Sequence, residues 1–302
     1  MIVYRCEDSL ESIFTAVYRS YEERRNHAET RIVLDDDPIL FGEDVQIVPE
    51  MEKVMKVMNT IRRRFGEEDY MTVCEALATE DPEKGQAVYQ TIVYGLAHRC
   101  LPGHLFDNLA NDDVLKAFGL ARTAWREIHH LMGFMRFQEL ENGILFASFA
   151  PKCNILTFLM SHFADRYPSE HFALYDERRG IFGIHPAREQ WYLQWGDKAP
   201  KLRYSATEKL YSELFREFCR SIAIKARFNP KLQRQMLPLR YREYMMEFDT
   251  SQSQADLRKR SACNRAGEIT IPDRDSGNET EVRLPVERTG MSQDFHKIWE
   301  SV

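Results

Sequence analysis

The chain has 302 residues, 43% of them hydrophobic, which is enough to bury one large core or two smaller ones. Its 41 basic and 47 acidic side chains give a net charge of −6, so any contact with nucleic acid must come from a local basic patch. No apolar run approaches the roughly 20 residues of a membrane-spanning helix, and the N-terminus turns acidic too early for a signal peptide. We therefore expect a cytoplasmic protein.

The six cysteines are too far apart to form paired CxxC zinc ligands or the CxxxCxxC triplet of a radical iron–sulfur enzyme. They are Cys6, Cys74, Cys100, Cys153, Cys219 and Cys263. We expect them to be reduced thiols, most of them buried. Neither a metal nor a cofactor is predicted.

The first half of the chain is predicted to be mostly helical. Residues 1–7 alternate like a short edge strand, and residues 8–25 follow with helical spacing. Two short extended pieces in residues 31–49 flank an acidic turn at residues 35–38. Helical spacing returns over residues 50–95 and 112–131. The expected buried face of the last helix consists of Val114, Leu115, Phe118, Trp125, Ile128 and Leu131.

The second half switches to a strand period. Two alternating runs, residues 133–140 and 144–151, flank Asn142-Gly143, which suits a tight turn, and they predict a β-hairpin. A helix over residues 154–167 and two or three strands over residues 171–195 follow. A further helix is predicted from about residue 205 to 226. Its expected inward face is Leu210, Leu214, Phe215, Phe218 and Ile222.

This order of elements predicts an α+β fold in which an antiparallel sheet is flanked by helices. We expect one domain over residues 1–248 and a mobile C-terminal extension over residues 249–302, which begins in a polar stretch. Within the extension, residues 268–272 and 281–285 can pair as a hairpin. Residues 294–302 can dock through Phe295 and Trp299.

The strongest local chemistry lies in residues 223–242, called the basic segment below. It contains no acidic residue, and aromatic residues are interleaved with its cations. Cations neutralise phosphates and rings stack on bases, a combination that single-strand binding proteins use. The alternative is a solvated basic face whose aromatic side chains pack inward. The candidate residues are Lys225, Arg227, Lys231, Arg234, Arg240 and Tyr241.

Two smaller groups of residues can also carry chemistry. His162 and Arg166 are four residues apart on one side of a predicted helix, where His162 can act as an acid or base and Arg166 can hold a phosphate. Asp176 precedes Arg178 at a strand end, so its carboxylate is either a base or the partner of a neighbouring arginine. A lone histidine is more often a core or capping residue, and both interpretations stay open.

Other catalytic patterns have little support. His129 and His130 have no HxxxH or HExxH spacing. Cys153 and His162 form a conceivable nucleophile pair, but nothing identifies an orienting third residue or an oxyanion hole. There is no GxGxxG sequence and no Walker loop, so the dinucleotide-binding and nucleotide-hydrolase readings are unsupported.

The segments "HHLMGFMRFQEL", "FAPKCNIL", "SHFADRYP", "FALYDERRG" and "NPKLQRQMLPLRYREYMMEF" resemble a bacterial family of DNA-metabolism or DNA-repair proteins of unknown activity. The resemblance extends over nearly all of residues 1–248. It implies that the gene lies beside one for a radical-SAM protein of DNA modification or repair. It also implies that some relatives are fused to a uracil-DNA-glycosylase-like domain, for which too few residues follow Asp249 here.

The family's recurring polar pattern adds one further candidate, Arg136, and establishes no catalytic role for any residue. The pattern falls on His130, Gly133, Arg136, Phe137, Asn154, His162, Phe163, Arg166, Asp176, Arg178, Asn229, Gln233, Pro238, Arg240 and Tyr241. Arg136, His162, Arg166 and Asp176 lie at turns and ends flanking one predicted sheet, where side chains can converge on a phosphodiester.

Three functions follow as hypotheses. The first is a nucleic-acid-interacting accessory protein that acts with a radical-SAM repair or modification enzyme. The second is a standalone enzyme on a nucleotide or modified base, with His162 or Asp176 as acid or base and Arg136, Arg166 and Arg178 binding phosphate. The third is a protein-interaction scaffold without DNA contact.

The sequence also predicts a break inside the basic segment. Pro238 disfavours helical geometry at Leu237, so Arg240 and Tyr241 should begin a separate short element. Tyr241 then either stacks on a base or packs in the core, and Arg240 either contacts a phosphate or forms a structural ion pair.

Overall fold

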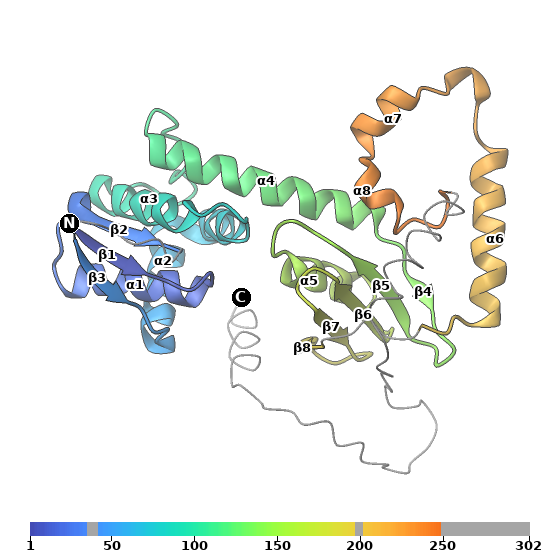
Figure 1. The fold of residues 1–302 in the computed structure, drawn as a ribbon, viewed down its shortest axis with the longest axis horizontal. Helices are drawn as coiled ribbons and strands as arrows, with labels where there is room; N and C mark the ends of the chain where they lie inside the picture. Colours follow the sequence, from blue (N-terminus) through green and yellow to red (C-terminus); the bar gives the residue numbers. More distant parts are fainter. Residues whose placement is uncertain (35–41, 197–201, 249–302) are drawn as a thin grey trace, which may run out of the picture. The chain divides into compact units, whose positions relative to one another are not determined.

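The computed structural model describes residues 1–34, 42–196 and 202–248 (Figure 1). Its backbone divides into two compact units. The first unit comprises Met1–His129 with Lys152–Ile155, and the second comprises His130–Pro151 with the residues from Leu156 onward. The acidic turn at residues 35–38, the hairpin at 268–285 and the docking segment at 294–302 lie outside the described residues.

The first unit contains a three-stranded parallel sheet in the order β2-β1-β3. The strands are β1 (Ile2–Arg5), β2 (Thr30–Val33) and β3 (Glu43–Gln46), and Ile2 pairs with Thr30 on one side and Glu43 on the other. The prediction that the first strand lies at an edge is therefore wrong. Val3 and Tyr4 are both fully buried, as expected for a strand with a neighbour on each side.

Helices make up most of the first unit, as predicted. They are α1 (Leu10–Glu22), α2 (Met51–Leu77), α3 (Lys84–His98) and most of α4 (Asp112–Phe134), with a short 3-10 turn, η1 (His27–Glu29). Ser9 caps α1 by accepting the backbone N–H of Ser12. Gly66 interrupts α2 with a φ of 89°, and the carbonyl of Phe65 accepts the N–H of Gly103 instead.

The second unit is built on a five-stranded mixed sheet in the order β4-β5-β6-β7-β8. The strands are β4 (Gln138–Glu139), β5 (Leu145–Phe149), β6 (Phe172–Asp176), β7 (Ile181–His185) and β8 (Tyr192–Trp195). The predicted hairpin is present as β4 and β5, and Gly143 in its turn has a φ of 78°. The α+β class is confirmed.

The sheet differs from the prediction because β5 and β6 are parallel. Helix α5 (Leu156–Arg166) lies between them in sequence and provides the crossover that a parallel pair requires. One face of the sheet buries Phe146, Ala173, Tyr175 and Phe182. The opposite face packs on α5, since a Cβ at Gly183 would overlap Met160.

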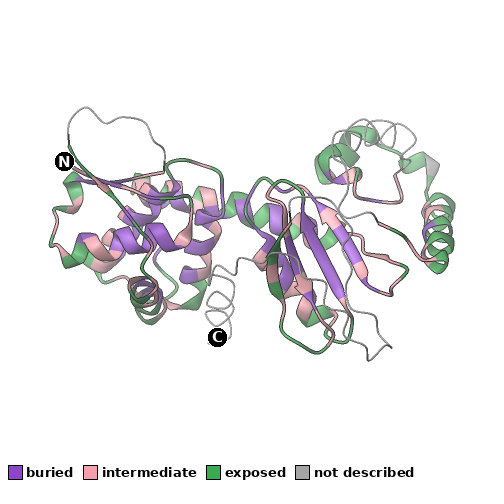
Figure 2. Cartoon of the chain, turned by 60° about the horizontal axis from the view of Figure 1, so that its bottom comes forward, coloured by how far each residue is buried: buried purple, intermediate pink, exposed green. Residues whose placement is uncertain are grey.

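Four elements complete the described part of the second unit: α6 (Ala206–Ser221), η2 (Lys225–Arg227), α7 (Pro230–Met236) and α8 (Leu239–Arg242). The predicted inward face of α6 is wrong, because its large apolar residues are exposed. Figure 2 shows most of this helix in the colour of exposed residues. In α4, Val114, Ile128 and Leu131 are buried as predicted, whereas Leu115 and Trp125 are exposed.

Candidate nucleic-acid interface

The basic segment folds into short helices separated by bends. Asn229 caps α7, its side chain accepting the N–H of Leu232, and Pro230 occupies the first turn. Leu237 leaves the helix with φ −131° and ψ 90°, and α8 begins after Pro238. The predicted break at Leu237 is confirmed, and its cause is the proline that follows.

Three exposed cations of the basic segment have no polar partner among the described residues. Arg227, Lys231 and Arg234 form no ion pair or side-chain hydrogen bond with any residue that the structure describes. Phe228 lies between two of them in sequence, and 73% of it is exposed. The side chain of Lys225 lies outside the description. This part of the segment therefore presents charge and an aromatic ring to solvent together.

Arg240 and Tyr241 occupy a different environment. Only 4% of Tyr241 is exposed, and its ring lies 5.7 Å from the rings of His130 and Phe134 at the end of α4. An Nη of Arg240 donates to the Tyr241 hydroxyl at 2.5 Å, and the guanidinium lies over the same ring. Tyr241 thus packs in the core, which is the alternative to stacking on a base, and it anchors α8.

Arg136 is held by protein groups. It donates to the carbonyls of Gly133 and Met135 at the end of α4, and its other terminal nitrogen lies 2.7 Å from a carboxylate oxygen of Glu247. A cation at this position complements the exposed carbonyls of a helix C-terminus. The Nε of Arg136 and the second oxygen of Glu247 are buried without a hydrogen-bond partner among the described residues. Arg136 therefore joins the end of α4 to the residues that follow α8.

Asp176 closes the turn between β6 and β7. One carboxylate oxygen accepts the backbone N–H groups of Arg178 and Arg179, and the other lies 3.0 Å from the Arg179 guanidinium. Burial raises the pKa of the Asp176 carboxyl, although Arg179 opposes this shift. Arg178 is exposed, and one of its terminal nitrogens donates to the Pro151 carbonyl at 3.4 Å. The pairing role for Asp176 is thus the one that its contacts support.

His162 and Arg166 lie on α5, as predicted. The His162 ring packs against the edge of Phe163, and Arg166 donates to the hydroxyl of Tyr167 at 3.3 Å. Within the described residues, no hydrogen bond or ion pair joins either side chain to Arg136, Asp176 or Arg178. The residues proposed for catalysis and phosphate binding are therefore not gathered into one hydrogen-bonded site.

The sequence interpretation missed three residues that connect the others. The Tyr244 hydroxyl donates to Glu177 at 3.1 Å, which ties the residues after α8 to the β6–β7 turn. Glu247 ties the same stretch to Arg136. The sequence contained one signal for Glu177 and Glu247. Each is an acidic residue close to a group of basic residues, a pattern typical of ion pairs.

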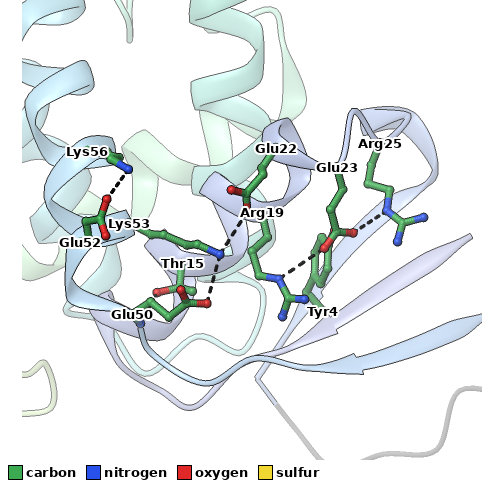
Figure 3. Close-up of polar contacts among 10 residues, drawn as sticks. All are labelled: Tyr4, Thr15, Arg19, Glu22, Glu23, Arg25, Glu50, Glu52, Lys53 and Lys56. Carbon is green, nitrogen blue, oxygen red and sulfur yellow. Dashed lines mark hydrogen bonds and ion pairs between the residues drawn. The ribbon is translucent and has the colours of Figure 1, made fainter.

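The first unit also contains a polar cluster, shown in Figure 3. Glu23 accepts from the Tyr4 hydroxyl at 3.1 Å and from Arg25 at 2.7 Å, and it pairs with Arg19. Lys53, at the start of α2, lies 3.1 Å from both Glu22 and Glu50. Opposite charges satisfy one another here, so the cluster joins β1, α1 and α2 and offers no charge of one sign to a ligand.

No group of three or more His, Cys, Asp or Glu side chains within the described ranges is arranged to hold a metal ion. No helix in the described part of the chain is long and apolar enough to cross a membrane.

A family model of a domain of unknown function, DUF4130, matches residues 82–247, which is more than half of the chain. The chain belongs to the DUF4130 family. Comparisons with curated proteins and with solved structures give no match. The DUF4130 match begins just before α3 and includes the basic segment, Arg136 and Glu247. The exposed cations and the anchored Tyr241 thus fall inside the part of the chain that defines the family.

Proposed function

We propose that this DUF4130 protein is a nucleic-acid-interacting accessory protein in DNA repair or modification. The observation that carries the proposal is the exposure of Arg227, Lys231 and Arg234, without acidic partners among the described residues, in the same short segment as the exposed ring of Phe228. When exposed cations neutralise phosphates, the counterions condensed on the nucleic acid are released, which favours binding. An exposed ring can stack on an unpaired base. Single-stranded DNA satisfies both requirements.

The charge of the rest of the chain restricts the proposed DNA contact to the basic segment. The basic segment contains six cations and no acid, so the remaining residues have a net charge of −12 against the total of −6. Nucleic acid is repelled by most of the chain and attracted to one segment of it. Binding should therefore be local and strongly dependent on salt. The partner is a radical-SAM repair or modification enzyme, a proposal that rests on the resemblance of the sequence segments quoted above.

A standalone enzyme has less support. Both carboxylate oxygens of Asp176 are occupied by the turn that it closes, and Arg136 is paired with Glu247. His162 has no hydrogen bond to a group that would orient it among the described residues. General acid or base catalysis requires a positioned group within reach of the reacting atom.

The experiment is a titration of fluorescent single-stranded DNA at several salt concentrations. Affinity should fall as the salt concentration rises. Arg227→Ala, Lys231→Ala or Arg234→Ala should each make the negative slope of log K against log salt concentration shallower by about 0.7, the value for one phosphate contact with a single strand. Phe228→Ala should weaken binding by about 1–3 kcal/mol at constant slope. Met236→Ala is the matched control, because it removes another exposed apolar side chain of the same segment that cannot stack.

Absence of binding at low salt would overturn the proposal. If Phe228→Ala and Met236→Ala reduce the affinity equally, Phe228 does not stack on a base, and only the electrostatic part of the proposal stands. Capture of the radical-SAM partner in the presence of nuclease, with no affinity for DNA, would support the scaffold hypothesis in its place.

A further inference from the structure

Helix α6 exposes its apolar face. Leu210, Leu214, Phe218 and Ile222 follow one another at four-residue intervals, and 55–59% of each is exposed. Tyr211 and Phe215 widen this row, and the rings of Phe215 and Phe218 lie 6.5 Å apart. These six residues are called the α6 apolar row below. An uninterrupted exposed row of this kind marks an interaction surface.

The polar side of α6 faces the rest of the second unit. Ser212 is buried, and its hydroxyl donates to Glu208 at 2.6 Å. Glu208 accepts the backbone N–H of Glu139, and Arg216 donates to the Met246 carbonyl at 2.8 Å. These bonds fix the rotation of the helix about its axis. Turning the α6 apolar row inward would break them, so the contacts of the helix keep the row exposed.

The chain contains a segment of matching pattern. Residues 294–302 place Phe295, Ile298, Trp299 and Val302 at positions i, i+3, i+4 and i+7, the spacing by which an amphipathic helix binds an apolar surface. We propose that residues 294–302 dock on the α6 apolar row of the same chain.

The point at which the described chain ends supports docking within one molecule. The Met246 carbonyl accepts from Arg216 of α6, so the residues that lead into 249–302 start from this helix. Forty-five residues, 249–293, connect that point to the docking segment. Their contour length of roughly 150 Å exceeds the ~24 Å length of a 16-residue helix many times. A tether of this length raises the local concentration of the segment above that of any second copy in dilute solution.

The test is photo-crosslinking of the full chain with benzoylphenylalanine at position 218. Trypsin should then yield a crosslink from α6 to peptide 289–297 or 298–302, within one chain and independent of protein concentration. A photo-reactive residue at Trp195, another exposed aromatic position, is the matched control and should give no such peptide. Crosslinks between two chains, or the same tail peptides from position 195, would overturn the proposal.

A second measurement uses variants outside the described body. Phe295→Ala with Trp299→Ala should abolish the crosslink at position 218 and raise the fluorescence of a bound apolar dye several-fold, because the α6 apolar row becomes uncovered. His296→Ala with Ser301→Ala, which spares the apolar positions, should change neither. If Phe295→Ala with Trp299→Ala leaves dye binding unchanged while Phe218→Glu reduces the sedimentation coefficient, a second copy covers the row and the proposal fails.

Discussion

Glu75 in α2 is a half-buried carboxyl that forms no ion pair with any residue the structure describes. Burial alone raises its pKa from the model-compound value of 4.5 to about 7. Between these values the folded chain keeps the proton and the unfolded chain releases it. The free energy of unfolding therefore falls as the pH rises through this window, and the loss is complete above about pH 7.

Glu75→Gln should remove this loss, because the amide stays neutral at every pH. The variant should exceed the parent by about 1–2 kcal/mol in free energy of unfolding at pH 8 and should match it near pH 4.5. Urea denaturation at the two pH values measures the difference. Glu68→Gln, at an exposed position of the same helix, is the control. A pH-independent effect of Glu75→Gln would show that its carboxyl is not desolvated.

Two helical glycines predict opposite effects of the same substitution. A Cβ at Gly95 of α3 would lie 2.8 Å from Cζ of Phe65 and would also overlap Leu105, whereas a Cβ at Gly119 of α4 would meet nothing within 4 Å. Gly95→Ala should lower the free energy of unfolding by about 1–3 kcal/mol through overpacking. Gly119→Ala should raise it by about 0.5–1 kcal/mol through helix propensity. Thermal and urea unfolding compare the pair, and a shared sign would contradict the packing at Gly95.

At the scale of elements, α8 is anchored to α4 by the side chain of Tyr241. A helix of four residues has little stability of its own, so its position depends on the Tyr241 ring between His130 and Phe134. Tyr241→Ala should release residues 239–242, seen as faster amide hydrogen exchange there. Tyr241→Phe keeps the ring and removes the hydroxyl that accepts from Arg240, at a cost of about 1 kcal/mol. Unchanged exchange in Tyr241→Ala would show that other contacts hold α8.

The elements also show which features the sequence could predict. The hairpin turn at Gly143 and the break at Leu237 depend on the conformational preferences of glycine and of residues before proline, which act locally. The apolar period of α6 predicted a helix correctly, but the period does not say whether the body of the protein or another segment covers the apolar face. The parallel pairing of β5 with β6 depends on a crossover helix, which hydrophobic alternation does not report.

The candidate site was harder to predict for a related reason. Residue type predicted charge and an aromatic ring in the basic segment, and the structure exposes Arg227 and Phe228. Residue type could not distinguish these from Arg136 and Tyr241, because partners more than a hundred residues away decide that difference. Glu247 occupies Arg136, and His130 with Phe134 covers Tyr241.

At the scale of the molecule, two consecutive residues belong to different units. Ile155 and Leu156 are both buried, but Ile155 is the last residue of the short stretch in the first unit and Leu156 opens the second. Each truncation to alanine should cost about 2–5 kcal/mol of unfolding free energy. Ile155→Ala should speed hydrogen exchange in α2 and α3, and Leu156→Ala should speed it in β5, β6 and β7. Faster exchange in the same elements for both variants would show that the units unfold as one.

The stretch Lys152–Ile155 has a consequence for how such a chain can be inherited. Glu127 accepts the backbone N–H groups of Lys152 and Cys153, and the carbonyl of Ala78 accepts that of Asn154, so these four residues complete the first unit from within the sequence of the second. The polypeptide passes between the units three times. A single crossover in the gene cannot transfer either unit intact. A crossover before the stretch separates residues 152–155 from the rest of the first unit, and one after it separates residues 130–151 from the rest of the second. The family match, residues 82–247, runs through this interleaved region and includes Lys152–Ile155 together with α3 and α4 of the first unit.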